Sequence, residues 1–165
     1  MWERAIASAQ QAGNRETVAI YRAAEAVCEA HCGNWSEARK RARAALEVAK
    51  GRDIEYAAAF ALALSGDGSE SLRLAAGLEK RFSEDTPVLF EYLPTLHALS
   101  ALAARAPRDA VKRLERAIPY DFAMPGTVLF AKFGGLYTVY VRGQAYLEAG
   151  RGRDPVGGFR FVGYG

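Results

Sequence analysis

Hydrophobic residues recur along this chain at intervals of three and four positions, and charged residues fill most positions between them. This spacing places apolar side chains on one face of an α-helix. We predict helices at about 2–12, 15–32, 35–49, 53–65, 69–82, 87–104, 108–118 and 128–149. Alternating segments rich in Val, Ile and Thr are missing from the sequence, so we expect no sheet. The predicted fold class is all-α, with about eight helices.

The predicted helices are separated by short segments rich in Gly, Pro, Asn and Asp. The breaks are Gly13-Asn14, Gly33-Asn34, Gly51, Gly66-Asp67-Gly68, Asp85-Thr86-Pro87, Ala106-Pro107 and the stretch from Pro119 to Pro125. Pro94 is an exception, because it lies inside the helix predicted at 87–104. Proline lacks the amide hydrogen of a helix interior, so we expect a kink there or a helix that effectively starts near Leu93.

Three segments share an order of small and apolar residues, which indicates an internal repeat. They are CGNWSEARKRARAAL from Cys32, SGDGSESLRLAAGL from Ser65 and RAPRDAVKRLERAI from Arg105. In each, a small residue follows the turn, and further small or apolar residues follow at offsets of four and then three: Ala38, Ala42 and Ala45; Ser71, Ala75 and Leu78; Ala110, Leu114 and Ala117. These offsets place the three residues on one helix face, which we predict packs closely against a neighbour.

This pattern resembles the tetratricopeptide repeat, a helix–turn–helix unit of about 34 residues that stacks into a right-handed superhelix, an α-solenoid. The residues that match the family are Gly143 and Tyr146 in a first helix, Trp35, Ala38, Ala45 and Leu46 around a turn and second helix, and Ala26, Ala59 and Ala98 at the early small position. The resemblance covers about 15–152, although the distance between turns grows along the chain. It implies a tetratricopeptide-like repeat domain over 1–150 and an irregular tail over 151–165.

A longer stretch, roughly from Ala57 to Gly150, is similar to the C-terminal repeat region of bacterial serine/threonine protein kinases. The resemblance implies a non-catalytic protein–protein interaction module that acts in signalling. Kinase motifs are missing from the sequence: VAIY carries Tyr21 in place of the phosphate-pairing lysine, and neither H-R-D nor D-F-G occurs. We therefore expect no enzyme activity in this chain. The alternative is a ligand- or partner-sensing domain of a bacterial transcriptional regulator.

In stacked repeats of this family the first helices line a concave surface. The family register places eight residues there: His31, Tyr56, Phe60, Tyr92, Leu99, Tyr137, Tyr140 and Gln144. We predict a groove for a protein or peptide partner, with Tyr56, Phe60, Tyr92, Tyr137, Tyr140 and Gln144 as its site residues, because tyrosine combines a large apolar area with a polar tip. The alternative is that these rings pack in the core. The clamp positions for a peptide carboxylate hold Ala23, Tyr56, Thr95 and Tyr140, so we expect no such clamp.

Charge and hydropathy argue against two other classes of partner. The chain has 22 basic and 19 acidic residues, a net charge of +3, which does not indicate a nucleic-acid partner. The run Arg39, Lys40, Arg41 and Arg43 is interpreted as a solvated helix face. The most apolar region, about 118–141, is interrupted by charged residues and prolines, and the N-terminus lacks the apolar stretch of a signal peptide. We therefore expect no membrane segment.

The segment CEAHC is the one candidate for metal binding. Cys28, His31 and Cys32 lie on one side of a helix, but a closed zinc site needs a fourth ligand, and nothing places His97 nearby. Free cysteines commonly pack as small hydrophobic residues. We expect no metal, no cofactor and no catalytic residues. The cysteine usage fits a reducing compartment, so we expect a cytoplasmic location.

The C-terminal segment GRGRDPVGGFRFVGYG resembles a phosphate-binding loop in its glycine spacing alone, because Gly158 and Phe159 stand where Lys and Ser or Thr are required. The repeat register calls for a second helix here, which Pro155 and Gly157 disfavour. We interpret 151–165 as the replacement of a lost helix. An incompletely capped array exposes apolar faces, so we expect self-association through its ends.

Overall fold

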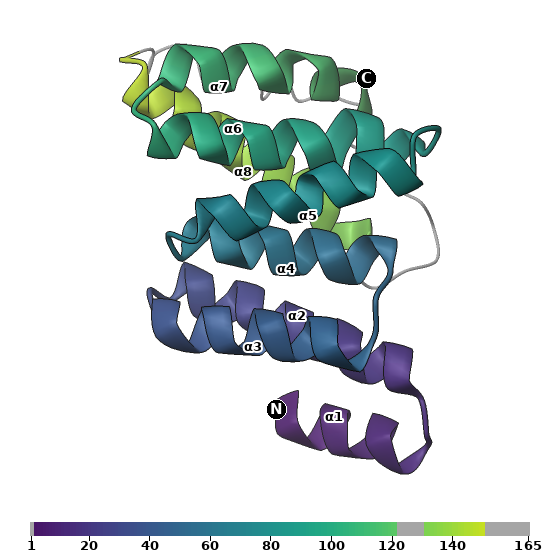
Figure 1. Cartoon of the computed structure of the whole chain (residues 1–165). Coiled ribbons are helices and arrows are strands. Elements are labelled where there is room, and N and C mark those ends of the chain that lie inside the picture. Colours follow the sequence, from purple (N-terminus) through teal and green to yellow (C-terminus); the bar gives the residue numbers. More distant parts are fainter. Residues whose placement is uncertain (1, 122–130, 151–165) are drawn as a thin grey trace, which may run out of the picture. The chain divides into compact units, whose positions relative to one another are not determined.

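A computed structural model describes residues 2–121 and 131–150, and those residues are almost entirely helical (Figure 1). The elements are α1 (Trp2–Gln11), α2 (Arg15–His31), α3 (Trp35–Val48), α4 (Arg52–Leu64), α5 (Gly68–Arg81), the π-helix η1 (Val88–Tyr92), α6 (Leu93–Ala103), α7 (Pro107–Leu114), the 3-10 helix η2 (Glu115–Tyr120) and α8 (Ala131–Glu148). No strand occurs among the described residues. The all-α prediction is confirmed for them.

The described residues group into two compact units, one that ends at Leu89 and one that begins at Phe90. The boundary falls inside the region 1–150 that the sequence predicts as one repeat domain. In the first unit every predicted helix bound lies within one residue of the observed bound. The predicted tail, 151–165, lies outside the described residues.

In the first unit each helix packs against its neighbours along the chain. Figure 1 shows α2 beside α3 and α4 beside α5, and α4 also contacts both α2 and α3. The core between these helices is rich in alanine, and Ala19, Ala23 and Ala26 are fully buried on α2. Small side chains let helix backbones approach closely, and Phe60 and Leu62 of α4 fill the remaining space.

Five helices, α1, α2, α4, α6 and α8, end in turns of one kind. The residue that follows the helix has a left-handed backbone at five places: Gly13, Gly33, Gly66, Arg105 and Gly150. At the first four, the next amide donates to the carbonyl oxygen five residues earlier, as Asn34 does to Glu29 at 2.9 Å and Asp67 does to Leu62 at 2.9 Å. This is the Schellman C-cap, which glycine favours because it has no Cβ.

The burial of the repeated positions confirms the predicted helix face. The nine residues predicted to share it, Ala38, Ala42, Ala45, Ser71, Ala75, Leu78, Ala110, Leu114 and Ala117, are each at most 1% exposed. The early small positions Ala26, Ala59 and Ala98 are fully buried. The order of small and apolar residues in the sequence thus identifies the packed side of these helices.

In the second unit Pro94 determines where α6 begins. The predicted helix 87–104 is divided into η1 and α6, and α6 starts at Leu93, as predicted. The amides of the first turn of a helix have no acceptor within that helix, so proline at the second position removes no hydrogen bond. In the helix interior proline would remove one. The preceding turn widens into a π-helix, and Thr95 Oγ1 donates to the carbonyl oxygen of Glu91 at 2.6 Å.

Helices α6, α7 and α8 pack against one another in the second unit. The helix predicted at 108–118 ends earlier, at Leu114, and continues as η2 with Pro119 inside it. A proline at that position cannot donate a hydrogen bond to the preceding turn, so the α-helical pattern is not maintained. Residues 122–130, which include part of the helix predicted at 128–149, lie outside the described residues.

Candidate functional site

Three of the six predicted groove residues are buried. Tyr56 is 4% exposed, Phe60 is fully buried, and Tyr92 is 2% exposed. The Phe60 ring lies 5.9 Å from the imidazole of His31 and 6.2 Å from the Tyr56 ring, measured between ring centroids. These rings therefore contribute to packing, in accord with the alternative that they belong to the core.

The other three predicted residues lie on α8 and reach the surface. Tyr140 is 44% exposed, and Tyr137 and Gln144 are half-buried. Gln144 Nε2 donates to Tyr140 Oη at 3.0 Å, which orients both side chains on the same side of the helix. The sequence-predicted site is thus brought together in part, as an exposed patch of Tyr137, Tyr140 and Gln144 that we call the α8 patch.

Two buried polar contacts hold α8 in place beneath this patch. Thr95 Oγ1 of α6 and Thr138 Oγ1 of α8 lie 2.8 Å apart in a hydrogen bond. Arg142 forms two parallel hydrogen bonds with the carboxylate of Asp121, one of them from Nη1 to Oδ1 at 2.9 Å. Because both side chains of this ion pair are at most 5% exposed, it fixes the rotation of α8 with little competition from water.

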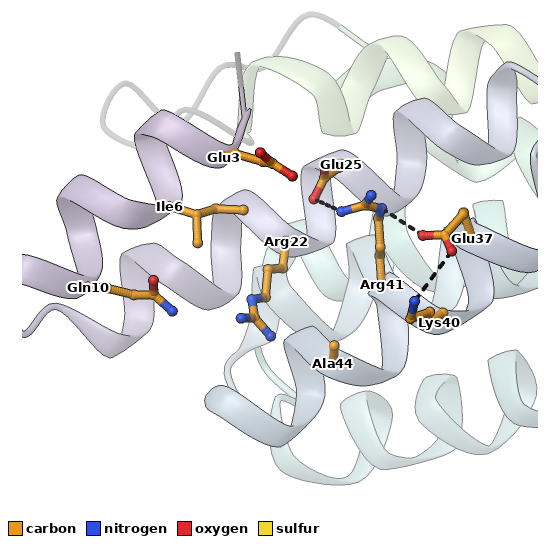
Figure 2. Close-up of a pocket in the computed structure, with 9 residues that line it drawn as sticks. All are labelled: Glu3, Ile6, Gln10, Arg22, Glu25, Glu37, Lys40, Arg41 and Ala44. Carbon is orange, nitrogen blue, oxygen red and sulfur yellow. Dashed lines mark ion pairs between the residues drawn. The ribbon is translucent and has the colours of Figure 1, made fainter.

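A pocket of about 400 Å³ opens between α1, α2 and α3 (Figure 2). It is lined by Glu3, Ile6, Gln10, Arg22, Glu25, Glu37, Lys40, Arg41 and Ala44. Arg41 Nη1 lies 2.6 Å from Oε2 of the buried Glu25, and Arg41 Nε lies 3.3 Å from Oε2 of Glu37. Lys40 Nζ completes the row, 3.5 Å from Glu37 Oε1. These four side chains neutralise one another and join α2 to α3.

A second pocket, of about 590 Å³, repeats the first pocket one helix pair later, between α3, α4 and α5. The α3 residues of the first pocket, at 37, 40, 41 and 44, lie 33 positions before four of the five α5 residues of the second, at 70, 73, 74 and 77; the fifth is Arg81. Gly33 and Gly66 are separated by the same interval. In the second pocket Arg81 is paired with the buried Glu55, and this hydrogen bond raises the pKa of Arg81. The two pockets are equivalent surfaces of successive helix pairs.

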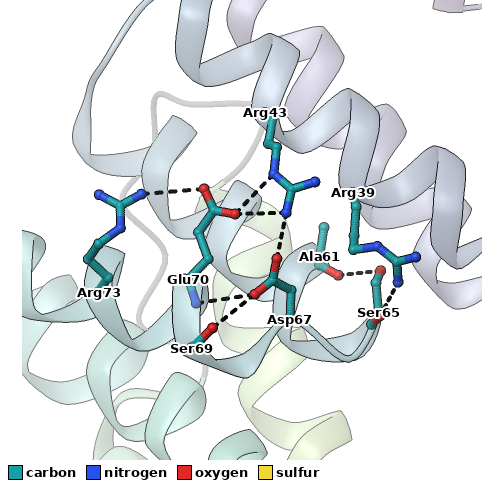
Figure 3. A network of polar contacts seen from close by, with 8 residues as sticks. All are labelled: Arg39, Arg43, Ala61, Ser65, Asp67, Ser69, Glu70 and Arg73. Carbon is teal, nitrogen blue, oxygen red and sulfur yellow. Dashed lines mark hydrogen bonds and ion pairs between the residues drawn. The ribbon is translucent and has the colours of Figure 1, made fainter.

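The basic run of α3 is a solvated face only in part, because its three arginines also contact residues outside α3. Arg39 Nη1 donates to the carbonyl oxygen of Ser65 at 2.5 Å (Figure 3). Arg43 reaches Asp67 at 2.5 Å and Glu70 at 3.0 Å, and Arg41 takes part in the row of ion pairs described above. Lys40 and Arg43 are the exposed residues of this run, with 77% and 48% of their side chains accessible. The sequence does contain a signal for these contacts, namely Asp67 and Glu70 at the start of α5, which the interpretation from sequence did not use.

The cysteine-rich segment of α2 does not assemble a ligand set. Cys28 and Cys32 are free cysteines at the surface. Partial burial of its thiol raises the pKa of Cys28, and the nearby Cys32 raises it further. Burial lowers the pKa of His31, whose ring lies against Phe60. Within residues 2–121 and 131–150, no group of three His, Cys, Asp or Glu side chains is arranged to hold a metal ion.

Comparisons with protein-family models, with curated proteins and with solved structures found no match to this chain. Among the helices that the structure describes, none combines the length and the apolar character needed to cross a membrane.

Proposed function

We propose that this chain is a non-catalytic protein-interaction module made of tetratricopeptide-like helix pairs stacked as an α-solenoid. The observation that carries the proposal is one register shared by four first helices. Each ends at a residue with a left-handed backbone: Gly33, Gly66, Arg105 or Gly150. The small residue that marks the family pattern lies seven positions before each of them, at Ala26, Ala59, Ala98 and Gly143.

The packing order within the first unit supports the same proposal. In a stacked array each first helix contacts its own second helix and the next pair. Here α2 contacts α3 and α4, and α4 contacts α3 and α5. The equivalent pockets at a 33-residue interval agree with this order. Such arrays act by presenting preformed helical surfaces to a partner, so binding involves little ordering of the chain.

The surface we propose for a protein or peptide partner is the α8 patch. Two tyrosines and a glutamine supply apolar area together with hydrogen-bonding groups, a combination common at interfaces. Tyr137 and Gln144 lie on one flank of α8, whereas Tyr146, also half-buried, lies on the other. Tyr146 therefore offers a control on the same helix.

The test begins with recovery of a partner protein by the immobilised full chain. The dissociation constant of the purified partner and the purified chain is then measured directly. We expect Tyr137→Ala and Gln144→Ala each to weaken binding, and Tyr146→Ala to leave it within about twofold, since a few contacts dominate most interfaces. Circular dichroism of each variant would verify that the helices are retained. Equal effects of Tyr137→Ala and Tyr146→Ala would remove the α8 patch from the proposal.

We also propose that the chain is related to the C-terminal region of a bacterial serine/threonine protein kinase. This rests on the resemblance of the stretch from Ala57 to Gly150. The test is the encoding gene: a kinase domain upstream in the same reading frame supports the relation. A DNA-binding domain in that place would contradict it and would favour a sensing domain of a transcriptional regulator.

A further inference from the structure

An apolar stripe runs along the exposed side of α8. Leu136 is 58% exposed, Tyr140 is 44% exposed, and Leu147 is 66% exposed. Together with Gly143 these residues follow the spacing i, i+4, i+7 and i+11, which places all four on one side of the helix. Thr138, Val141 and Ala145, which are fully buried, lie on the opposite side. The stripe therefore faces away from the helices that hold α8.

The corresponding side of α2 is covered by other helices. Counting back from the left-handed residue at the helix end, Leu147, Gly143, Tyr140 and Leu136 correspond to Ala30, Ala26, Ala23 and Ala19 of α2. Those four alanines are at most 6% exposed, and α2 packs against α3 and α4. The stripe thus occupies a side that takes part in helix packing elsewhere in the same molecule, but here Leu136, Tyr140 and Leu147 are larger than the alanines and exposed.

The exposed side of α8 is also free of charge over the length of the stripe. From residue 136 to residue 148 the helix has two charged side chains, Arg142 and Glu148. Arg142 is buried in its ion pair with Asp121, and Glu148 follows the last residue of the stripe. Two copies of this surface can meet without like-charge repulsion, whereas a charged partner would find no counter-charge there.

We propose that the stripe is an interface between two copies of this chain, whose α8 helices pack antiparallel around a two-fold axis near Val141 and Arg142. In that register Leu136 of one copy meets Leu147 of the other, and Tyr140 meets Gly143. A Cβ atom built on Gly143 would meet nothing within 4 Å, so the space above this residue is open to a ring. Each contact occurs twice, as a two-fold interface requires.

The stripe is self-complementary because its spacing of four, three and four residues is symmetric about its centre, so that Tyr140 of each copy faces Gly143 of the other. This arrangement favours a second copy over an unrelated helix. The inference goes beyond the proposed partner surface and does not require it, because Leu136, Gly143 and Leu147 are outside the α8 patch. Tyr140 belongs to both surfaces and is therefore left unchanged in the test.

The test is sedimentation equilibrium of the purified full chain over a range of concentrations. We expect a monomer–dimer equilibrium in the unmodified protein. Leu136→Glu and Leu147→Lys should each raise the dissociation constant by about tenfold or more, because each change removes an apolar contact at two symmetric places. Leu72→Glu, at another exposed leucine on α5, is the matched control and should leave the equilibrium unchanged.

The double variant Leu136→Glu with Leu147→Lys tests the register. The two positions are about 16 Å apart along one helix, too far for an ion pair within a copy. In the antiparallel pair the introduced glutamate of each copy meets the introduced lysine of the other. Dimerisation should therefore recover in the double variant relative to both single variants.

Three results would overturn the proposal. One is a monomer at every concentration, as expected if residues 151–165 cover the stripe or if the stripe binds a different protein in place of a second copy. Another is a dimer that both single variants retain. The third is a double variant that dimerises no better than the single ones. None of these measurements includes a partner protein, so their failure is distinguishable from failure of the proposed function.

Discussion

At the scale of the residue, Arg105 occupies a backbone position that glycine holds in the equivalent turns. Its φ of 58° is the one positive φ of a non-glycine residue among those described. Its amide donates to the carbonyl oxygen of Leu102 at 2.9 Å, and the next amide, of Ala106, donates to Ala101 at 2.9 Å. The turn thus makes its hydrogen bonds, but the left-handed backbone places Cβ of Arg105 too close to the following carbonyl oxygen.

We predict that Arg105→Gly raises the free energy of unfolding by about 0.5–1 kcal/mol. Relief of the left-handed strain exceeds the added entropy of glycine in the unfolded chain. Urea denaturation followed by circular dichroism would measure the change. Arg108→Gly, the same substitution within α7, is the matched control and should lower stability, because glycine is a poor helix former. Loss of stability in Arg105→Gly would contradict the assignment of strain.

At the scale of the element, α8 is held by a buried ion pair, whereas α7 carries an exposed one of the same chemistry. The side chains of Arg142 and Asp121 are 3% and 5% exposed. Those of Arg113 and Asp109 are 45% and 50% exposed. Removing one partner of a buried pair leaves an uncompensated charge, but at the surface water replaces the partner.

We predict that Asp121→Ala lowers the free energy of unfolding by about 3–5 kcal/mol, because Arg142 is then buried without its counter-charge. Asp109→Ala should cost less than about 1 kcal/mol. Thermal and urea denaturation of the two variants, compared with the unmodified chain, would give both values. Similar costs for the two substitutions would show that Asp121 and Arg142 are solvated in solution.

At the scale of the whole molecule, the chain is made of two compact units, and Phe60 is the largest fully buried side chain of the first. We predict that Phe60→Ala costs about 3–5 kcal/mol through the cavity that it leaves. Hydrogen exchange should show the greatest loss of amide protection in α2 to α5, because contacts in helical arrays are mainly between neighbours. The prediction fails if the greatest loss occurs in α6 to α8.

The elements of the first unit were predictable because the signals that define them are local. Glycine at the turns and the spacing of small residues depend on the backbone and on helix geometry, not on distant contacts. Pro94 likewise located the start of α6 through its own missing amide hydrogen. The candidate site was less predictable, because the same aromatic pattern fits a binding groove and a packed core.

The sequence by itself therefore determined the helices of the first unit, their glycine turns and the buried face of each repeated segment, since periodicity and backbone preference act within a few residues. The tertiary structure decided which aromatic rings are buried, as Tyr56 and Phe60 are, and which remain exposed, as Tyr140 does. It also decided that Arg41 pairs with Glu25 across two helices. These outcomes depend on neighbours distant in sequence, and a pattern along one helix contains no information about what packs against it.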